Sequence, residues 1–199
     1  DIFVHDRQTG TTTRVSVDSS GNEGNGYSYS PAISADGRYV AFYSYADNLV
    51  AGDGNGSPDI FVHDRQTGTT TRVSVDSSGN EGNSYSYFPA ISADGRHVAF
   101  YSYADNLVAG DGNGTTDIFV HDRQTGTTTR VSVDSSGNEG NSYSYFPAIS
   151  ADGRHVAFYS YADNLVAGDG NGTTDIFVHD RQTGTTTRVS VDSSGNEGN

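Results

Sequence analysis

The sequence predicts an all-β protein of the β-propeller type, and three observations support this prediction: a long repeat, four short strand patterns in each repeat, and apolar residues on both sides of those strands. The string DIFVHDRQTGTTTRVSVDSSGNEGN begins at Asp1, Asp59, Asp117 and Asp175, so the period is 58 residues. Residues 84–141 and 142–199 are identical, and residues 26–83 differ from them only at Gly26, Ser30, Tyr39, Ser57 and Pro58. Self-similarity at such a period indicates a propeller, a solenoid or a repeat array.

The repeat divides the chain into one leading half unit and three whole units. Residues 1–25 hold only the third and fourth strand patterns, which is a half blade. Residues 26–83, 84–141 and 142–199 each hold four patterns and are expected to form complete blades of four antiparallel strands. Together they form one propeller-type domain or part of a larger ring.

The unit 84–141 illustrates the four expected strands. The first covers Tyr87 to Ser92 and the second His97 to Tyr103, joined through Asp94-Gly95, a dipeptide typical of hairpin turns. A long Gly-rich loop, residues 104–116, leads to the third strand, Asp117 to Asp122. A turn at residues 124–126 precedes the fourth strand, Thr128 to Val133, and no segment has a helical period.

The strand interiors favour sheets that are covered on both faces. HVAFYS and DIFVHD place apolar or aromatic side chains on both sides of the pleat instead of alternating with polar ones. Radially stacked blades bury both faces, whereas a two-sheet sandwich leaves one face of each sheet in water. A β-solenoid is the remaining alternative, although its coils are usually much shorter than this repeat.

The segment SADGRHVAFYS, followed by DIFVHDRQTG, resembles the TolB-type, WD-repeat-like propeller blade. That pattern has a Ser-Pro-Asp-Gly turn, an Ile-Ala-Phe strand, an Asp-Ile-Tyr-Val strand and a Gly turn. The likeness covers the whole unit, but Ala93 replaces the usual Pro and the loop 104–116 is longer. The resemblance implies a propeller fold and a binding platform more than any one activity.

Composition narrows the classes of function. All 11 basic residues are Arg, the net charge is −14, and Cys is absent, which excludes disulfides and thiol chemistry. The acidity opposes binding to nucleic acid, and no apolar run is long enough for membrane insertion. An extracellular, periplasmic or cell-surface bacterial location is favoured.

One loop carries a calcium-like pattern. Asp111, Asn113 and Asp117 give a D-x-N-x-x-x-D spacing, and oxygen ligands two residues apart in a Gly-rich loop are what calcium favours. The terminal bidentate Glu of a full calcium loop is missing, and Asp and Asn that simply form turns are the alternative. The predicted calcium ligands are Asp53, Asn55, Asp59, Asp111, Asn113, Asp117, Asp169, Asn171 and Asp175.

Tyrosines enter the first strand and leave the second strand of each unit, next to the same acidic loops. Tyr with Asp and Asn can form a shelf on which a sugar stacks, whereas packing between blades is the alternative role. The candidate ligand-binding residues are Tyr85, Tyr87, Tyr101, Tyr103, Tyr143, Tyr145, Tyr159 and Tyr161.

Catalysis has little support. His121 and Asp122 are neighbours on a strand, so their side chains point to opposite faces and cannot form an oriented His–Asp pair. Every blade also presents the same groups, whereas an active site needs different groups that converge. We therefore expect no enzyme activity and no catalytic residues.

Blade number bears on function. Propellers close with about 4–8 blades, so three blades and a half do not close a ring. The expectation is a non-catalytic binding or assembly scaffold that forms a homo-oligomer or belongs to a longer repeat array, with a glycan or protein ligand. The alternatives are a calcium-assisted, lectin-like propeller that binds carbohydrate, and an engineered or repeat-amplified fragment without a ligand.

Overall fold

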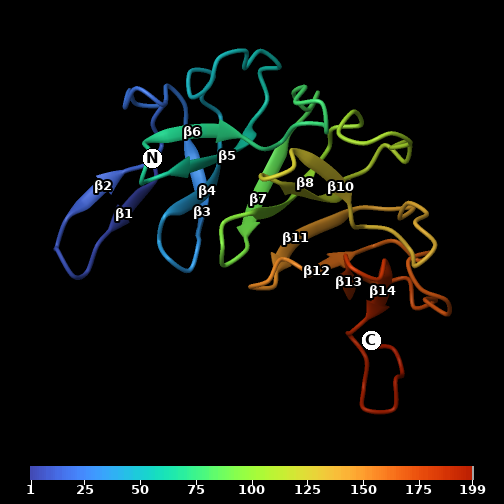
Figure 1. Cartoon of the computed structure of the whole chain (residues 1–199). Coiled ribbons are helices and arrows are strands. Elements are labelled where there is room, and N and C mark those ends of the chain that lie inside the picture. Colours follow the sequence, from blue (N-terminus) through green and yellow to red (C-terminus); the bar gives the residue numbers. More distant parts are fainter. Residues whose placement is uncertain (199) are drawn as a thin grey trace.

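The computed structural model describes residues 1–198, and it arranges fourteen strands in one half blade and three whole blades. The half blade is the two-stranded sheet β1 (Phe3–His5) and β2 (Thr12–Arg14). The sheets stack side by side along an open arc, with the half blade at one end and the last blade at the other (Figure 1). The predicted all-β propeller architecture is confirmed.

Each whole blade is an antiparallel sheet whose strands pair in chain order. The first contains β3 (Ser28–Ile33), β4 (Tyr39–Ser44), β5 (Asp59–Asp64) and β6 (Thr69–Arg72). The second contains β7 (Ser86–Ile91), β8 (His97–Ser102), β9 (Asp117–Asp122) and β10 (Thr127–Arg130). The third contains β11 (Ser144–Ile149), β12 (His155–Ser160), β13 (Asp175–Asp180) and β14 (Thr185–Arg188).

The strand ends agree closely with the predicted ones, except in the fourth strand. That strand ends at Arg130 and not at Val133, because the chain leaves the sheet once Val131 N has bonded to Ile118 O. Val133 then pairs with Glu139 in an isolated bridge, which folds the connector back on itself.

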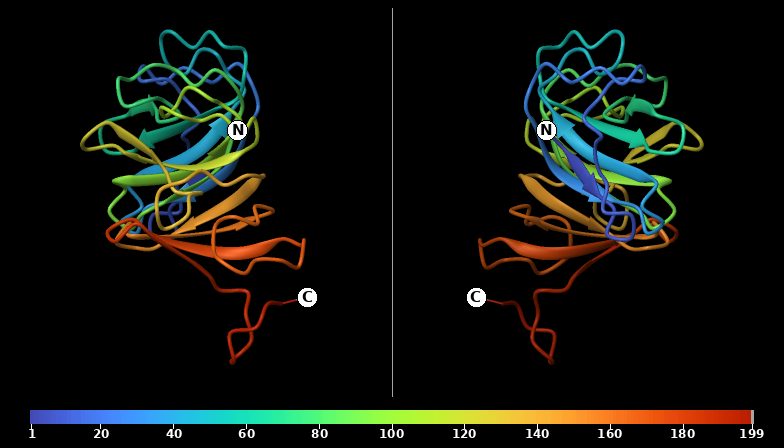
Figure 2. Two further views of the ribbon diagram at one scale, coloured as in Figure 1. Left: turned by 90° about the vertical axis from the view of Figure 1, so that its right-hand side faces the viewer. Right: turned by 90° about the vertical axis from the view of Figure 1, so that its left-hand side faces the viewer.

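The first strands β3, β7 and β11 lie next to one another, so they form the inner side of the arc. Side views show the sheets layered one after another (Figure 2). Apolar side chains fill each space between sheets: Ile118, Val120 and Val131 of the second blade meet Val156, Phe158, Leu165 and Phe177 of the third. Burial on both faces was predicted, and all six residues of β9 are buried.

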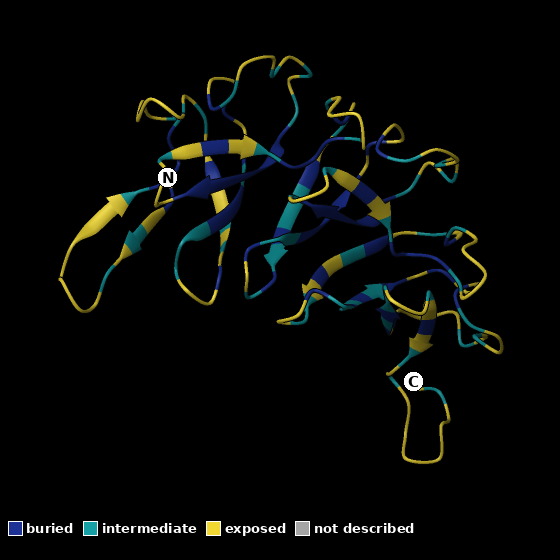
Figure 3. Ribbon diagram, viewed as in Figure 1, coloured by how far each residue is buried: buried dark blue, intermediate teal, exposed yellow. Residues whose placement is uncertain are grey.

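The ends of the arc are different. The exposed segments of Figure 3 include much of the half blade and part of the last strand, β14. β13 has the same sequence as β9, yet its burial alternates between buried and open positions. One face of the last sheet is therefore uncovered.

Candidate functional site

The propeller has two faces with different chemistry. We call the face with the long loops and connectors, residues 104–116 and 134–141 and their equivalents, the loop face. We call the face with the tight hairpin turns, residues 93–96 and 123–126 and their equivalents, the turn face. The two sets of segments lie at opposite ends of the strands (Figure 1).

On the loop face, three carboxylates of each whole blade lie around one arginine guanidinium. Oxygens of Asp111, Asp117 and Glu139 all lie within 4.8 Å of one another, which is close enough to hold a metal ion. Arg130 Nη1 lies 3.4 Å from Asp111 Oδ1 and 3.8 Å from Asp117 Oδ2, and it pairs with Glu139. The equivalent cluster in the first blade is Asp53, Asp59, Glu81 and Arg72.

Burial controls the charge of this cluster. Asp117 is fully buried, and Ser132 Oγ donates a hydrogen bond of 2.5 Å to Asp117 Oδ1. Burial raises the pKa of Asp117 to about 6, and it also raises the pKa of Asp111. Among the described residues, Arg130 Nε has no hydrogen-bond partner. Crowded acids of this kind attract a cation, and the guanidinium already supplies one.

The predicted calcium ligands come together only in part. The two aspartates of each set lie close together: Asp111 with Asp117 in the second blade, and Asp53 with Asp59 in the first. In the third blade, Asp169 and Asp175 both lie within 3.6 Å of Arg188 Nη1. Asn113 Nδ2 instead donates to Asp117 Oδ2 at 3.0 Å, and its Oδ1 accepts the Thr115 N–H. Asn55 and Asn171 bond in the same way. The calcium set stays a prediction.

Sequence spacing missed Glu139 and Arg130 as members of this cluster. Glu139 stands in the connector after the fourth strand, whereas Asp117 begins the third strand, so no short motif joins them. The signal was the coincidence of an Arg at the end of the fourth strand with a Glu in the following connector, repeated in every unit.

The candidate tyrosines divide into an exposed set and a packed set. The rings of Tyr85, Tyr103, Tyr143 and Tyr161 are exposed at the strand ends, whereas Tyr87, Tyr101, Tyr145 and Tyr159 are buried or half-buried. The packed rings touch across the blades: Tyr101 and Tyr145 meet edge to face with centroids 5.1 Å apart. Burial raises the pKa of Tyr101 and of Tyr103, the latter to about 12, so both stay neutral at ordinary pH.

A bulge in the inner strand places a further aromatic residue in this network. Phe88 has a φ of 50°, where L-residues are strained, and the strand register shifts between Tyr87 and Ala90. The Phe88 ring lies 4.6 Å from that of Phe146, which has the same backbone conformation. Phe88 was not among the candidates, although Pro89 inside a strand pattern is a bulge signal.

The histidines of the third strands have structural partners. His121 Nδ1 lies 2.9 Å from Thr128 Oγ1, and the Thr128 hydroxyl donates to Val75 O. Because that hydroxyl proton is already used, the imidazole Nδ1–H is the donor to Thr128. Asp122 instead forms a bidentate pair with Arg96. His121 and Asp122 therefore serve different contacts, as their positions on the strand predicted.

Solved structures share this fold at low sequence identity. TolB from Acinetobacter baumannii superposes with a TM-score of 0.55 and 21% identity over 98% of this chain, and the putative TolB from Agrobacterium tumefaciens with 0.53 and 21% over 81%. The tricorn protease gives 0.51 and 19% over 88% of this chain and 15% of its own. No protein-family model and no curated protein matches the sequence.

The chain spans 39% and 48% of the two TolB structures. They support the TolB-like propeller fold that the turn and strand motifs implied. Since both TolB proteins and a protease share the fold, it assigns no activity by itself. None of the described residues belongs to a helix that is long and apolar enough to cross a membrane.

Proposed function

We propose that this chain is a non-catalytic propeller scaffold that associates with further copies of itself through the open face of its last blade. The observation that carries the proposal is a comparison of identical residues. Ile118 and Val131 are 0% and 1% exposed beneath the following blade, whereas their equivalents Ile176 and Val189 are 42% and 48% exposed. The sheet face that the second blade packs against the third blade is therefore exposed in the third blade.

The half blade supplies the matching partner. Phe61, Phe119 and Phe177 are each fully buried against the preceding sheet, but Phe3, their equivalent, is 56% exposed. One end of the arc thus presents the front of a blade and the other end presents the back. Such surfaces fit head to tail, which generates a ring when the rotation closes and a filament when it does not.

The test is sedimentation of the chain at several concentrations. We expect particles heavier than the 21.0 kDa monomer, and Val189→Asp should return them to monomers because it buries a charge in the contact. Ala51→Asp, which adds the same charge at an exposed loop position of the first blade, should leave association intact. Phe3→Ser distinguishes two modes of association. It should disrupt a head-to-tail contact between the half blade and a last blade, but not a contact between two last blades. A strictly monomeric native chain overturns the proposal.

A second candidate is calcium binding at the loop face. It is supported by the mutual approach of Asp53, Asp59 and Glu81, and of their counterparts in the second blade. Calorimetry with calcium, followed by a chelator, tests it. Heat and a thermal shift that the chelator reverses support it, and the absence of both removes it.

A calcium-assisted, lectin-like role is the corresponding ligand proposal. Exposed rings of Tyr85, Tyr103, Tyr143 and Tyr161 beside the acidic loops support it, because a sugar stacks on an exposed ring. Binding to a glycan array that is lost in Tyr85→Ala and Tyr143→Ala supports this role, and an array without signal removes it. We also propose a periplasmic, extracellular or cell-surface location, which cell fractionation tests.

A further inference from the structure

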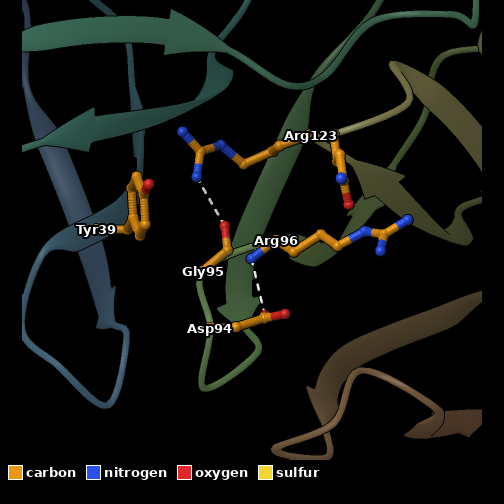
Figure 4. A pocket seen from close by; sticks show the side chains of 6 residues that line it. Tyr39, Asp94, Gly95, Arg96 and Arg123 are labelled. Atoms are coloured by element: carbon orange, nitrogen blue, oxygen red, sulfur yellow. Dashed lines mark hydrogen bonds between the residues drawn. The ribbon is translucent and has the colours of Figure 1, made fainter.

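The turn face carries clefts that no function described above uses. One cleft of about 310 Å³ is lined by Tyr39, Asp94, Gly95, Arg96, Arg123 and Gln124 (Figure 4). A second, of about 450 Å³, is lined by the equivalents His97, Asp152, Gly153, Arg154, Arg181 and Gln182. In each, one blade supplies the turn and two arginines, and the preceding blade supplies the aromatic wall.

The first arginine of the cleft has no acidic partner. Arg123 Nη1 donates to Gly95 O at 2.7 Å, and its guanidinium carbon lies 4.4 Å from the centroid of the Tyr39 ring. No carboxylate of residues 1–198 lies within 4.0 Å of it. Burial lowers the pKa of Arg123, because the half-buried cation is poorly hydrated. A guanidinium offers five N–H donors in a planar fork that matches carboxylate and phosphate oxygens.

The second arginine is held in place by an acid outside the cleft lining. Arg96 Nε and Nη2 donate to the two oxygens of Asp122 at 2.8 and 2.6 Å, so the side chain is fixed in one orientation. Asp94, which also lines the cleft, is tied to its own turn: Oδ1 accepts from Ser92 Oγ at 2.6 Å and from Arg96 N at 3.0 Å. Its charge opposes an anion, and because Asp122 neutralises Arg96, the attraction for an anion comes from the guanidinium of Arg123.

We propose that each walled cleft binds a small oxyanion, a carboxylate or phosphate group, through the guanidinium of Arg123 in one cleft and of Arg181 in the other. Arg181 repeats the geometry, with Nη1 2.6 Å from Gly153 O and His97 in place of the Tyr39 wall. Both clefts lie within one chain, so this site does not depend on self-association.

The first blade provides an internal contrast. Arg65 Nη1 donates to Gly37 O at 2.6 Å, as in the other blades, but the half blade has no second strand to supply a wall. Arg65 is exposed, whereas Arg123 and Arg181 are half-buried. Water competes more strongly at the exposed guanidinium, so we expect two oxyanion sites per chain and not three.

The experiment is calorimetric titration at low ionic strength with inorganic phosphate and, separately, with acetate and citrate. Chloride at matched ionic strength is the reference, and the Val189→Asp variant is a second host, in which the last-blade contact is disrupted. We expect two sites in the native chain, one in Arg123→Gln, none in Arg123→Gln with Arg181→Gln, and two in Arg65→Gln. Binding of phosphate alone identifies phosphate groups as ligands, and binding of acetate and citrate identifies carboxylates.

Two further variants separate binding from folding. Asp94→Asn keeps the turn acceptor but removes the opposing charge, so it should raise the affinity of the first cleft about threefold to tenfold. Arg123→Lys keeps the charge but loses the fork, so it should weaken binding there without unfolding the blade. Unchanged binding in the double Gln variant, or no binding by the native chain, overturns the proposal.

Discussion

The hydroxyl of Thr128 donates a hydrogen bond to the carbonyl oxygen of Val75 in the preceding blade, and the same contact joins every pair of neighbouring sheets. Thr128 N also donates to Ser77 Oγ at 3.0 Å, so the outer strand of one blade is tied to the connector that enters it. The apolar core between blades is non-directional, whereas these hydrogen bonds fix the position of one sheet against the next.

Thr128→Val should therefore destabilise the protein more than its small change in volume implies. The substitution leaves Val75 O and His121 Nδ1 without their partner in a buried place, which costs about 1–3 kcal/mol. Urea unfolding measures the loss. Thr128→Ser keeps the hydroxyl and should recover most of the stability. A Thr128→Val variant that is as stable as the native chain would show that these hydrogen bonds contribute nothing.

Gly95 is predicted to be intolerant of a side chain for two separable reasons. Its φ of 73° disfavours any Cβ, and a Cβ there would lie 2.1 Å from Tyr39 Cδ2. Gly37 has nearly the same φ, 72°, with no neighbour closer than 3.7 Å. Gly37→Ala should cost about 1–2 kcal/mol from backbone strain alone.

Gly95→Ala should cost about 1–3 kcal/mol beyond that control, because the Tyr39 ring must move. Thermal unfolding of the two variants measures the difference. If both alanine variants lose the same stability, the contact between the turn and the preceding blade contributes nothing. Gly95→Ala should also weaken phosphate binding in the first cleft, since Tyr39 forms its wall.

The blade could be predicted from the sequence because its signals are local. Asp94-Gly95 specifies a hairpin, and DIFVHD with apolar residues on both sides specifies a strand buried on both faces. An oriented pair of His121 and Asp122 could likewise be excluded, because neighbouring residues on a strand point to opposite faces.

The sites could be predicted only in part because they depend on how sheets and connectors come together. Arg130 reaches Glu139 only when the connector folds back through the bridge between Val133 and Glu139. Tyr39 covers Gly95 only because two blades stack with a particular rotation. Neither relationship corresponds to a short spacing in the sequence, and the sequence also does not show that Asp117 is fully buried.

Acid should destabilise the protein through the arginine–aspartate pairs of the turn face. Hydrogen bonds from Arg96 hold the pKa of Asp122 well below its usual range, and Arg38 and Arg154 act on Asp64 and Asp180 in the same way. A carboxyl with a lowered pKa in the folded state stabilises it fully above the unfolded pKa of about 3.9, and this contribution is lost as the pH falls below that value.

The loop-face carboxyls act in the opposite direction. Burial raises the pKa of Asp59 to about 7, so the folded state takes up a proton there before the unfolded state does and gains stability as the pH falls from about 7 towards 4.

The variant Asp122→Asn separates the contribution of the turn-face pair from that of the loop-face carboxyls. The variant should be less stable than the native chain at pH 7, and the gap should narrow below about pH 4. Urea unfolding across this range measures the gap; a constant gap would show that the pair does not titrate with folding.

Removing the internal cation should change how the loop face treats calcium. Arg72 Nη1 lies 3.6 Å from Asp53 Oδ1 and 3.5 Å from Asp59 Oδ2, and it pairs with Glu81. Arg72→Gln leaves three mutually close carboxylates without this positive charge, which destabilises the free protein and favours a divalent cation. Calcium should therefore raise the unfolding temperature of Arg72→Gln by more than that of the native chain. Magnesium, which accepts fewer protein ligands, should have a smaller effect.

The control is Arg7→Gln, which removes the same charge from the exposed turn of the half blade and should respond to calcium like the native chain. An equal calcium response in Arg72→Gln and Arg7→Gln would mean that the guanidinium does not compete with the metal.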